Sequence, residues 1–160
     1  MILKNGNDVL ELCEKCGSVL SYKINGGEFI AKGAKRPLFT FALLDNDGRQ
    51  IRVNSSEAEK IILEKNENGC KLIFDGMKNL MLGAAITVEK NGENGFKWHI
   101  VAENNTGMLL EWIEFPQITV PDSLVGEGGD SELFWPALEG MLIQDKTVRE
   151  KSWLNYREIG

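Results

Sequence analysis

Residues 96–115 read FKWHIVAENNTGMLLEWIEF and carry the clearest structural signal in the chain. Apolar and polar side chains alternate up to Asn104, which is typical of a strand with one buried face. Asn105–Gly107 predicts a turn, and Met108–Phe115 predicts a return strand, so we expect one long hairpin. The return strand is apolar on both faces, which indicates a central strand covered on both sides. Pro116 ends the pairing because proline has no N–H to donate.

Short strands separated by turn signals fill the chain before this hairpin. The expected strands are Val9–Glu14, Ser18–Ile24, Glu28–Ala31, Leu38–Leu44, Gln50–Val53, Lys60–Lys65, Cys70–Asp75 and Ala85–Lys90. Met77–Gly83 is apolar but irregular and predicts a crossover between sheets. Alternation of strands and helices is absent, so we expect an all-β, antiparallel sandwich or barrel with little helix.

One segment, Ser55–Lys65, is ambiguous between helix and strand. Ser56–Glu59 matches a helix capping box, with apolar residues following at helical spacing. We favour a strand from Lys60, because the hairpin signal Asn66–Gly69 and an alternating strand come directly after it.

Length and charge bound the function. The chain has 160 residues and a net charge of −6, which suits one domain spanning residues 1–160 with a sizeable core. Basic residues are scattered, so nucleic acid and anionic membranes are not expected partners, whereas neutral ligands such as sugars remain open. The sequence has neither an apolar run of about 20 residues nor a signal-peptide pattern, so we expect a cytoplasmic protein.

The sequence predicts no metal, no cofactor and no catalytic residue. Cys13 and Cys16 resemble half of a zinc knuckle, but only Cys70 and His99 remain to complete four ligands, so reduced cysteines are favoured. His99 is the only histidine, and a mutarotase-like site needs a carboxylate partner and usually a second histidine.

The candidate binding residues follow the strands. Residues 126–130 read GEGGD, and the two acids with no following lysine argue against a phosphate loop. Four carboxylates are instead candidates to bind sugar hydroxyls: Glu127, Asp130, Glu132 and Glu139. Trp135 offers a flat apolar face to a sugar ring. The alternative is that the acids are solvated and Trp135 packs under its loop, while Trp98 and Trp112 are expected in the core.

Several motifs together resemble a known family. They are the strand pair around Gly17, the Trp98–Thr106 strand, Glu114-Phe115-Pro116, and the loop Leu124–Asp130 leading to Trp135-Pro136. They resemble the N-terminal β-supersandwich, galactose-mutarotase-like domain of large α-galactosidase-type glycoside hydrolases. The resemblance implies that catalytic carboxylates lie on a separate (β/α)-barrel, against which the sandwich packs while lending a loop to the sugar site.

Three functions are consistent with these residues. The first is the non-catalytic N-terminal region of a glycoside hydrolase, with the barrel and carbohydrate as partners. The second is a freestanding carbohydrate-binding module, for which we weigh Glu127, Asp130, Trp135 and Glu139. The third and least favoured is a mutarotase-like aldose epimerase. The amphipathic end Ser152–Ile159 predicts a chain that continues, or a homo-oligomer.

Overall fold

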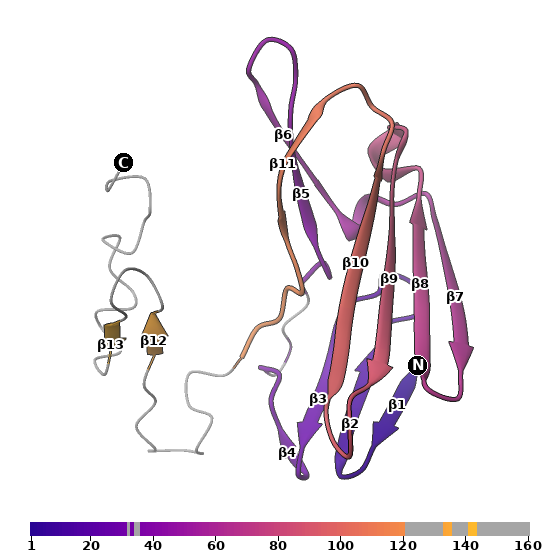
Figure 1. The fold of residues 1–160 in the computed structure, drawn as a ribbon, viewed down its shortest axis with the longest axis vertical. Helices are drawn as coiled ribbons and strands as arrows, with labels where there is room; N and C mark the ends of the chain where they lie inside the picture. Colours follow the sequence, from indigo (N-terminus) through magenta and orange to yellow (C-terminus); the bar gives the residue numbers. More distant parts are fainter. Residues whose placement is uncertain (32, 34–35, 121–132, 136–140, 144–160) are drawn as a thin grey trace. The chain divides into compact units, whose positions relative to one another are not determined.

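A computed structural model describes residues 1–31, 33, 36–120, 133–135 and 141–143. The chain divides into two compact units, Met1–Val120 and Pro121–Gly160, and each is described by itself. Every strand pair in the described residues is antiparallel, and their only helical segments are two 3₁₀ turns (Figure 1). The all-β, antiparallel prediction is therefore confirmed, and one domain over residues 1–160 stays a prediction.

The first unit holds three sheets. The strands of the first sheet, in spatial order, are β1 (Ile2–Asn5), β2 (Asp8–Leu12), β3 (Val19–Ile24) and β4 (Gly27–Glu28). Those of the second are β10 (Phe96–Asn104), β9 (Leu82–Lys90), β8 (Gly69–Asp75) and β7 (Lys60–Asn66). Those of the third are β11 (Leu109–Glu114), β5 (Thr40–Leu44) and β6 (Gln50–Asn54). In the second unit, β12 (Leu133–Trp135) pairs with β13 (Met141–Ile143).

Side chains from all three sheets meet in one hydrophobic core. The fully buried members with the largest side chains are Phe39, Phe41, Phe74, Leu10, Leu12, Leu38, Leu43, Leu72, Met77, Leu82, Ile86 and Val53. Phe39 lies at the junction, with its ring centroid 4.8 Å from that of Phe41 and 5.0 Å from that of Phe74. One face of each four-stranded sheet is thereby covered, which explains the alternating burial along these strands.

Tight turns fix most of the strand pairs. The Asp45 carboxylate accepts hydrogen bonds from the backbone N–H groups of Asp47 and Arg49, at 2.9 and 2.8 Å, and so closes the β5–β6 turn. Gly17 has φ +71° between β2 and β3, and a Cβ there would lie 2.6 Å from the Phe74 ring. A glycine is therefore needed at this position for both backbone conformation and space.

The long hairpin predicted for Phe96–Phe115 is wrong in its pairing, although both of its strands exist. β10 pairs along its whole length with β9, and β11 pairs with β5, with Ile113 opposite Phe41. The predicted turn is instead a loop in which the Asn104 side chain donates to the Met108 carbonyl at 2.8 Å. Alternation specifies which face of a strand is buried, and it does not specify the neighbouring strand.

β11 is an edge strand rather than the predicted central one. It is the outermost strand of its sheet, and Leu109 is 64% exposed. Both faces of β11 are apolar in sequence, but only one face is partly buried. The side chains on the other face point outward.

The predicted crossover at Met77–Gly83 is also wrong. This segment forms the 3₁₀ turn η2 (Met77–Asn79) and joins β8 to β9, which are neighbours in one sheet. Gly76 and Lys78 take left-handed backbone conformations, with φ +63° and +54°, which reverse the chain tightly enough for direct pairing.

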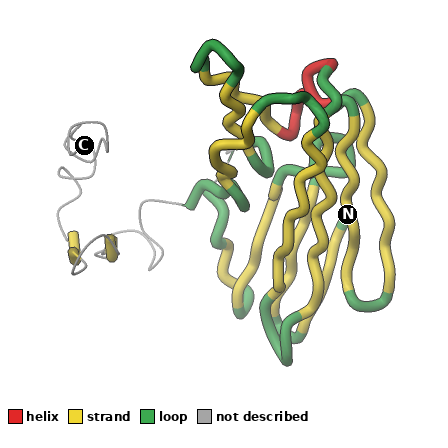
Figure 2. The backbone as a smooth tube through the Cα atoms, turned by 45° about the horizontal axis from the view of Figure 1, so that its top comes forward, coloured by secondary structure: helices red, strands yellow, loops and turns green. Residues whose placement is uncertain are grey.

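The segment Ser55–Lys65, which was ambiguous between helix and strand, contains a short helical turn followed by a strand. The strand predicted from Lys60 is confirmed as β7, and a short 3₁₀ turn, η1 (Ser55–Glu57), precedes it. The capping box is real but lies at Asn54 and Glu57 rather than at Ser56–Glu59. Figure 2 shows η1 and η2 together at one end of the strands.

Candidate functional site

The structure does not test the sequence-predicted sugar-binding residues. Glu127, Asp130 and Glu139 lie outside the described residues. Trp135 ends β12, where its backbone is described and its side chain is not. The carbohydrate site on these four residues therefore stays a prediction.

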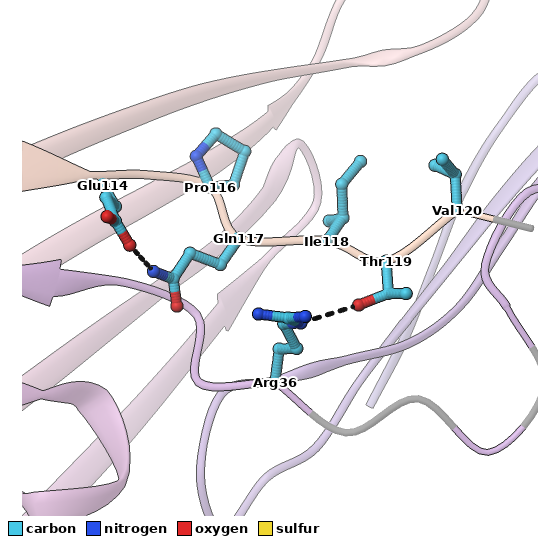
Figure 3. Close-up of a pocket in the computed structure, with 7 residues that line it drawn as sticks. All are labelled: Arg36, Glu114, Pro116, Gln117, Ile118, Thr119 and Val120. Atoms are coloured by element: carbon cyan, nitrogen blue, oxygen red, sulfur yellow. Dashed lines mark hydrogen bonds between the residues drawn. The ribbon is translucent and has the colours of Figure 1, made fainter. Parts of the chain in front are cut away.

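The described residues contain an open hollow of about 440 Å³ beside the segment that follows β11. It is lined by Arg36, Glu114, Pro116, Gln117, Ile118, Thr119 and Val120. Figure 3 shows Gln117 and Thr119 pointing to one side of this segment, toward Arg36, while Ile118 and Val120 point to the other. This alternation is typical of an extended backbone.

Backbone hydrogen bonds hold the lining segment in place. The Gln117 N–H donates to the Leu38 carbonyl, and the Ala31 N–H donates to the Thr119 carbonyl, each at 2.8 Å. The segment is thus anchored on both sides although it belongs to no sheet, and its side chains have defined directions.

Polar groups of both kinds line the hollow. Arg36 Nε donates to Thr119 Oγ1 at 3.0 Å, and the Gln117 amide donates to Glu114 and, at 3.1 Å, to Thr40 Oγ1. A guanidinium and a carboxylate beside apolar Pro116 can bind a small polar ligand by charge-assisted hydrogen bonds. The sequence patterns gave no indication of this group. The proximity of Arg36 to residues 114–120 depends on pairing between segments that are distant in the sequence.

Trp112 is not in the core, contrary to the prediction, whereas Trp98 packs against the core as predicted. Arg52 Cζ lies 4.9 Å from the centroid of the Trp112 ring. Ala42 lies between them in the sheet, and its small side chain lets the guanidinium reach across. Because Arg52 already covers this ring, Trp112 is a poor platform for a sugar.

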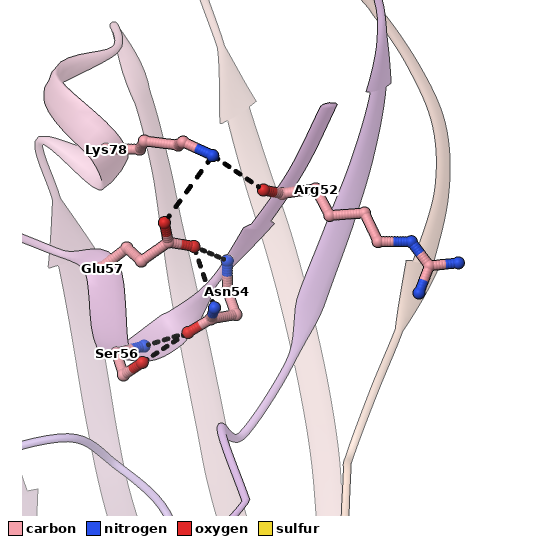
Figure 4. Close-up of polar contacts among 5 residues, drawn as sticks. All are labelled: Arg52, Asn54, Ser56, Glu57 and Lys78. Atoms are coloured by element: carbon pink, nitrogen blue, oxygen red, sulfur yellow. Dashed lines mark hydrogen bonds and ion pairs between the residues drawn. The ribbon is translucent and has the colours of Figure 1, made fainter. Parts of the chain in front are cut away.

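A second polar cluster has a structural role. Asn54 Oδ1 accepts from the Ser56 N–H at 3.0 Å, and Glu57 accepts from both the backbone and the side-chain amide of Asn54 at 2.9 Å (Figure 4). Lys78 lies 3.8 Å from Glu57 and donates to the Arg52 carbonyl at 3.3 Å. These contacts cap η1 and tie it to η2, so the side chains are occupied by the fold.

The cysteines do not form a metal centre with other described residues. Among those residues, no group of three His, Cys, Asp or Glu side chains could hold a metal ion. Cys13 and Cys16 are half-buried, and Cys70 is buried on β8. Burial raises the pKa of Cys70 to about 11, against smaller opposing effects of Lys65 and the N-terminal ammonium. The Cys70 thiol is therefore protonated and unreactive at neutral pH.

His99 lies on the exposed face of the second sheet, directly opposite Thr87 on β9. The position is that of an ordinary surface histidine.

Comparison with known proteins identifies no relative, since no family model matches the chain and no curated protein is significantly similar to it. None of the helical segments among the described residues has the length and apolar character needed to cross a bilayer.

Proposed function

We propose that this chain is the non-catalytic N-terminal β-sandwich region of a glycoside hydrolase, of the galactose-mutarotase-like supersandwich type. The observation that supports the proposal is the pair of four-stranded antiparallel sheets that bury their side chains in one core. Such a scaffold offers rigid edges and loops to a neighbouring domain. On this proposal, the chain packs against a (β/α)-barrel that carries the catalytic carboxylates.

The role proposed for the residues after Val120 is contact with the sugar. Glu127, Asp130 and Glu139 accept hydrogen bonds from sugar hydroxyls, and the Trp135 ring packs on the apolar face of the sugar ring. Charged acceptors form the stronger hydrogen bonds, so these residues set affinity and orientation rather than the chemical step.

The test of the first proposal is the coding sequence beyond Gly160 together with the activity of its full product. We expect the reading frame to continue into a long alternation of strand and helix patterns, and the full product to hydrolyse a glycoside. A stop codon after Gly160, or a continuation without that alternation, would contradict the proposal.

The hollow at Arg36 and Glu114 favours a second candidate function, a freestanding carbohydrate-binding module. It places a cation, a carboxylate and an amide around one open space in the described residues. Isothermal titration of the 160-residue chain with neutral mono- and oligosaccharides tests this candidate.

Two variants separate the two candidate binding regions. If the hollow binds the sugar, Arg36→Ala weakens binding at least tenfold, which is the loss expected when a charge-assisted hydrogen bond worth about 1.5–3 kcal/mol is removed. If the segment that contains Trp135 binds the sugar, Trp135→Ala weakens binding at least tenfold instead. Glu67→Gln, in the exposed β7–β8 loop, is the matched control and leaves binding unchanged. The absence of binding to any sugar tested would remove this candidate.

A further inference from the structure

The outer face of the second sheet carries an ordered pattern that the proposed function does not use. Side chains directly opposite one another on paired strands form rows across the sheet. One row, which we call the apolar row, consists of Val101, Ala85, Ile73 and Ile62. It crosses all four strands, which lie side by side in Figure 1, and Val101 is 48% and Ile62 36% exposed.

Polar rows border the apolar row on both sides. The row on one side consists of His99, Thr87, Lys71 and Glu64. The row on the other side contains Glu103 opposite Gly83, and Asp75 opposite Lys60. An apolar strip with a charged rim on each side has the composition of a protein interface rather than of an ordinary solvated sheet face.

The charges on this face form no ion pair within the described part of the chain, although the Asp75 carboxylate accepts a hydrogen bond from the Gly76 N–H at 2.9 Å. The ion pairs recorded among the described residues join the N-terminal ammonium to Glu14 and Lys78 to Glu57. Lys71, Asp75 and Lys60 are exposed and make no ion pair with a described residue. They are therefore available to charges on another molecule.

The order of the charges identifies a second copy of the chain as the matching partner. A two-fold axis along the apolar row places each strand over the same strand of the copy and exchanges the two polar rows.

Lys71 then faces Asp75 of the copy, and Glu64 faces Lys60 of the copy. His99 faces Glu103 of the copy, Thr87 lies over Gly83, and the apolar rows face each other. Lys60, Glu64, Lys71 and Asp75 each meet an opposite charge, and the symmetry doubles each pair.

We propose that the exposed face of the sheet β10-β9-β8-β7 is a homodimer interface with its two-fold axis along the apolar row. A two-fold axis parallel to the strands fits less well. It places Lys71 over Thr87 and Asp75 over Gly83, so that both charges are left without a partner at the centre of the contact.

The size of the face predicts a weak dimer. Four strands spaced about 4.8 Å apart, with a rise of about 3.3 Å per residue, cover a face of roughly 15 by 25 Å. A contact of this size is at the lower end of specific interfaces, so we expect dissociation at micromolar concentrations.

Sedimentation velocity of the full chain over a wide concentration range is the first measurement. We expect a concentration-dependent monomer–dimer equilibrium. Lys71→Asp places like charges opposite each other twice, so the dissociation constant should rise at least about tenfold. Lys15→Asp, in the exposed β2–β3 turn, makes the same change in net charge away from this face and leaves the equilibrium unchanged.

A four-residue charge swap then tests the geometry. Lys60→Asp, Glu64→Lys, Lys71→Asp and Asp75→Lys together preserve the net charge and the opposite-charge neighbours within each chain. On the proposed axis, the swapped chain associates with itself within about threefold of the parent, because each of the swapped charge pairs is retained with its sign reversed and the other contacts are unchanged. The swapped chain and the parent form no mixed dimer when combined, because like charges then face each other.

Three results would overturn the proposal, with melting temperatures confirming that each variant is folded. One is a monomer at every concentration, as expected if residues 121–160 or an unrelated protein cover the face. Another is a dimer indifferent to Lys71→Asp, as expected for association through Ser152–Ile159. The third is a folded four-residue swap that does not associate with itself.

Discussion

The second and third sheets of the first unit are built in different ways. In the second sheet, β7, β8, β9 and β10 each pair with the strand next to them in the sequence, and the chain simply turns back at each end. In the third sheet, β5 and β6 form a local hairpin, but β11 joins β5 from far along the chain. Local turn signals specify the first kind of pairing, and only the shared core specifies the second.

Central strands and the edge strand β11 also differ in how far their apolar side chains are buried. β8 and β9 have neighbours on both sides and bury alternate residues fully, such as Leu72 and Ile86. β11 is paired on one side only and leaves Leu109 and Ile113 exposed. The predictions that follow test how strongly the third sheet depends on the second.

The largest effect is expected at the junction between these two sheets. Phe39→Ala removes a ring that contacts both Phe41 and Phe74, and the resulting cavity should cost about 3–5 kcal/mol of unfolding free energy. Urea denaturation measures this loss. Leu109→Ala on the exposed side of β11 is the control and should change stability by less than about 0.5 kcal/mol. Similar losses for both variants would contradict the shared core.

A smaller effect is expected at Gly69, where β8 lies directly against β9. A Cβ at Gly69 would lie 1.9 Å from the Val88 carbonyl oxygen, so Gly69→Ala must push β8 and β9 apart. We expect a loss of about 1–3 kcal/mol in urea denaturation. At Gly27, the nearest atom to an added Cβ is 3.5 Å away, so Gly27→Ala should cost less. An equal cost at both positions would show that β8 and β9 are not packed this closely.

A side-chain contact between β6 and β11 tests the non-local pairing of the third sheet. The Arg52 guanidinium over Trp112 links β6 to β11 across β5, and such contacts contribute about 0.5–1 kcal/mol at exposed sites. A double-mutant cycle with Arg52→Ala and Trp112→Ala should give a coupling energy in this range. Additive losses would mean that β11 does not lie beside β5 as described.

The smallest effect is a pH dependence at the edge of the first sheet. Partial burial by itself would raise the pKa of Glu28. Hydrogen bonds from Ser21 and from the backbone N–H groups of Ile30 and Tyr22, with the charge of Lys23, instead lower the pKa below its usual 4.5. A lowered pKa in the folded state stabilises the protein above about pH 4.5, and this contribution is lost as pH falls through the folded-state value.

Glu28→Gln should therefore lower the melting temperature more at pH 7 than at pH 3. Ser21→Ala removes one donor, whose oxygen lies 2.5 Å from the carboxylate, and should show a smaller part of the same pH dependence. A melting-temperature difference between Glu28→Gln and the parent that is equal at both pH values would exclude a role for the ionised carboxylate.

Local patterns predicted most of the fold. The turn residues Asn66–Gly69 and the alternating strand Cys70–Asp75 specified a hairpin that the structure confirms. The partner of Leu109–Glu114 could not be predicted in this way, because alternation specifies a buried face and not a neighbour. β1 was missed because Ile2–Asn5 is short and lacks a long alternating pattern.

The site was less predictable than the fold. Arg36 and Glu114 line the same hollow because the segment after β11 lies along the residues before β5, an arrangement that no local motif encodes. Trp112 was assigned to the core because it is apolar. The sequence does not show that Arg52 lies two strands away on the same face. The residues predicted to bind sugar, Glu127, Asp130, Trp135 and Glu139, remain a prediction from composition and resemblance.

The most direct test of this architecture is a set of cross-strand nuclear Overhauser effects measured on the labelled chain in solution. The structure predicts backbone contacts between Ile113 and Phe41, and between His99 and Thr87. It predicts no ladder of contacts joining Phe96–Asn104 to Leu109–Glu114. Such a ladder would restore the simple hairpin and contradict the separation of these two strands into different sheets.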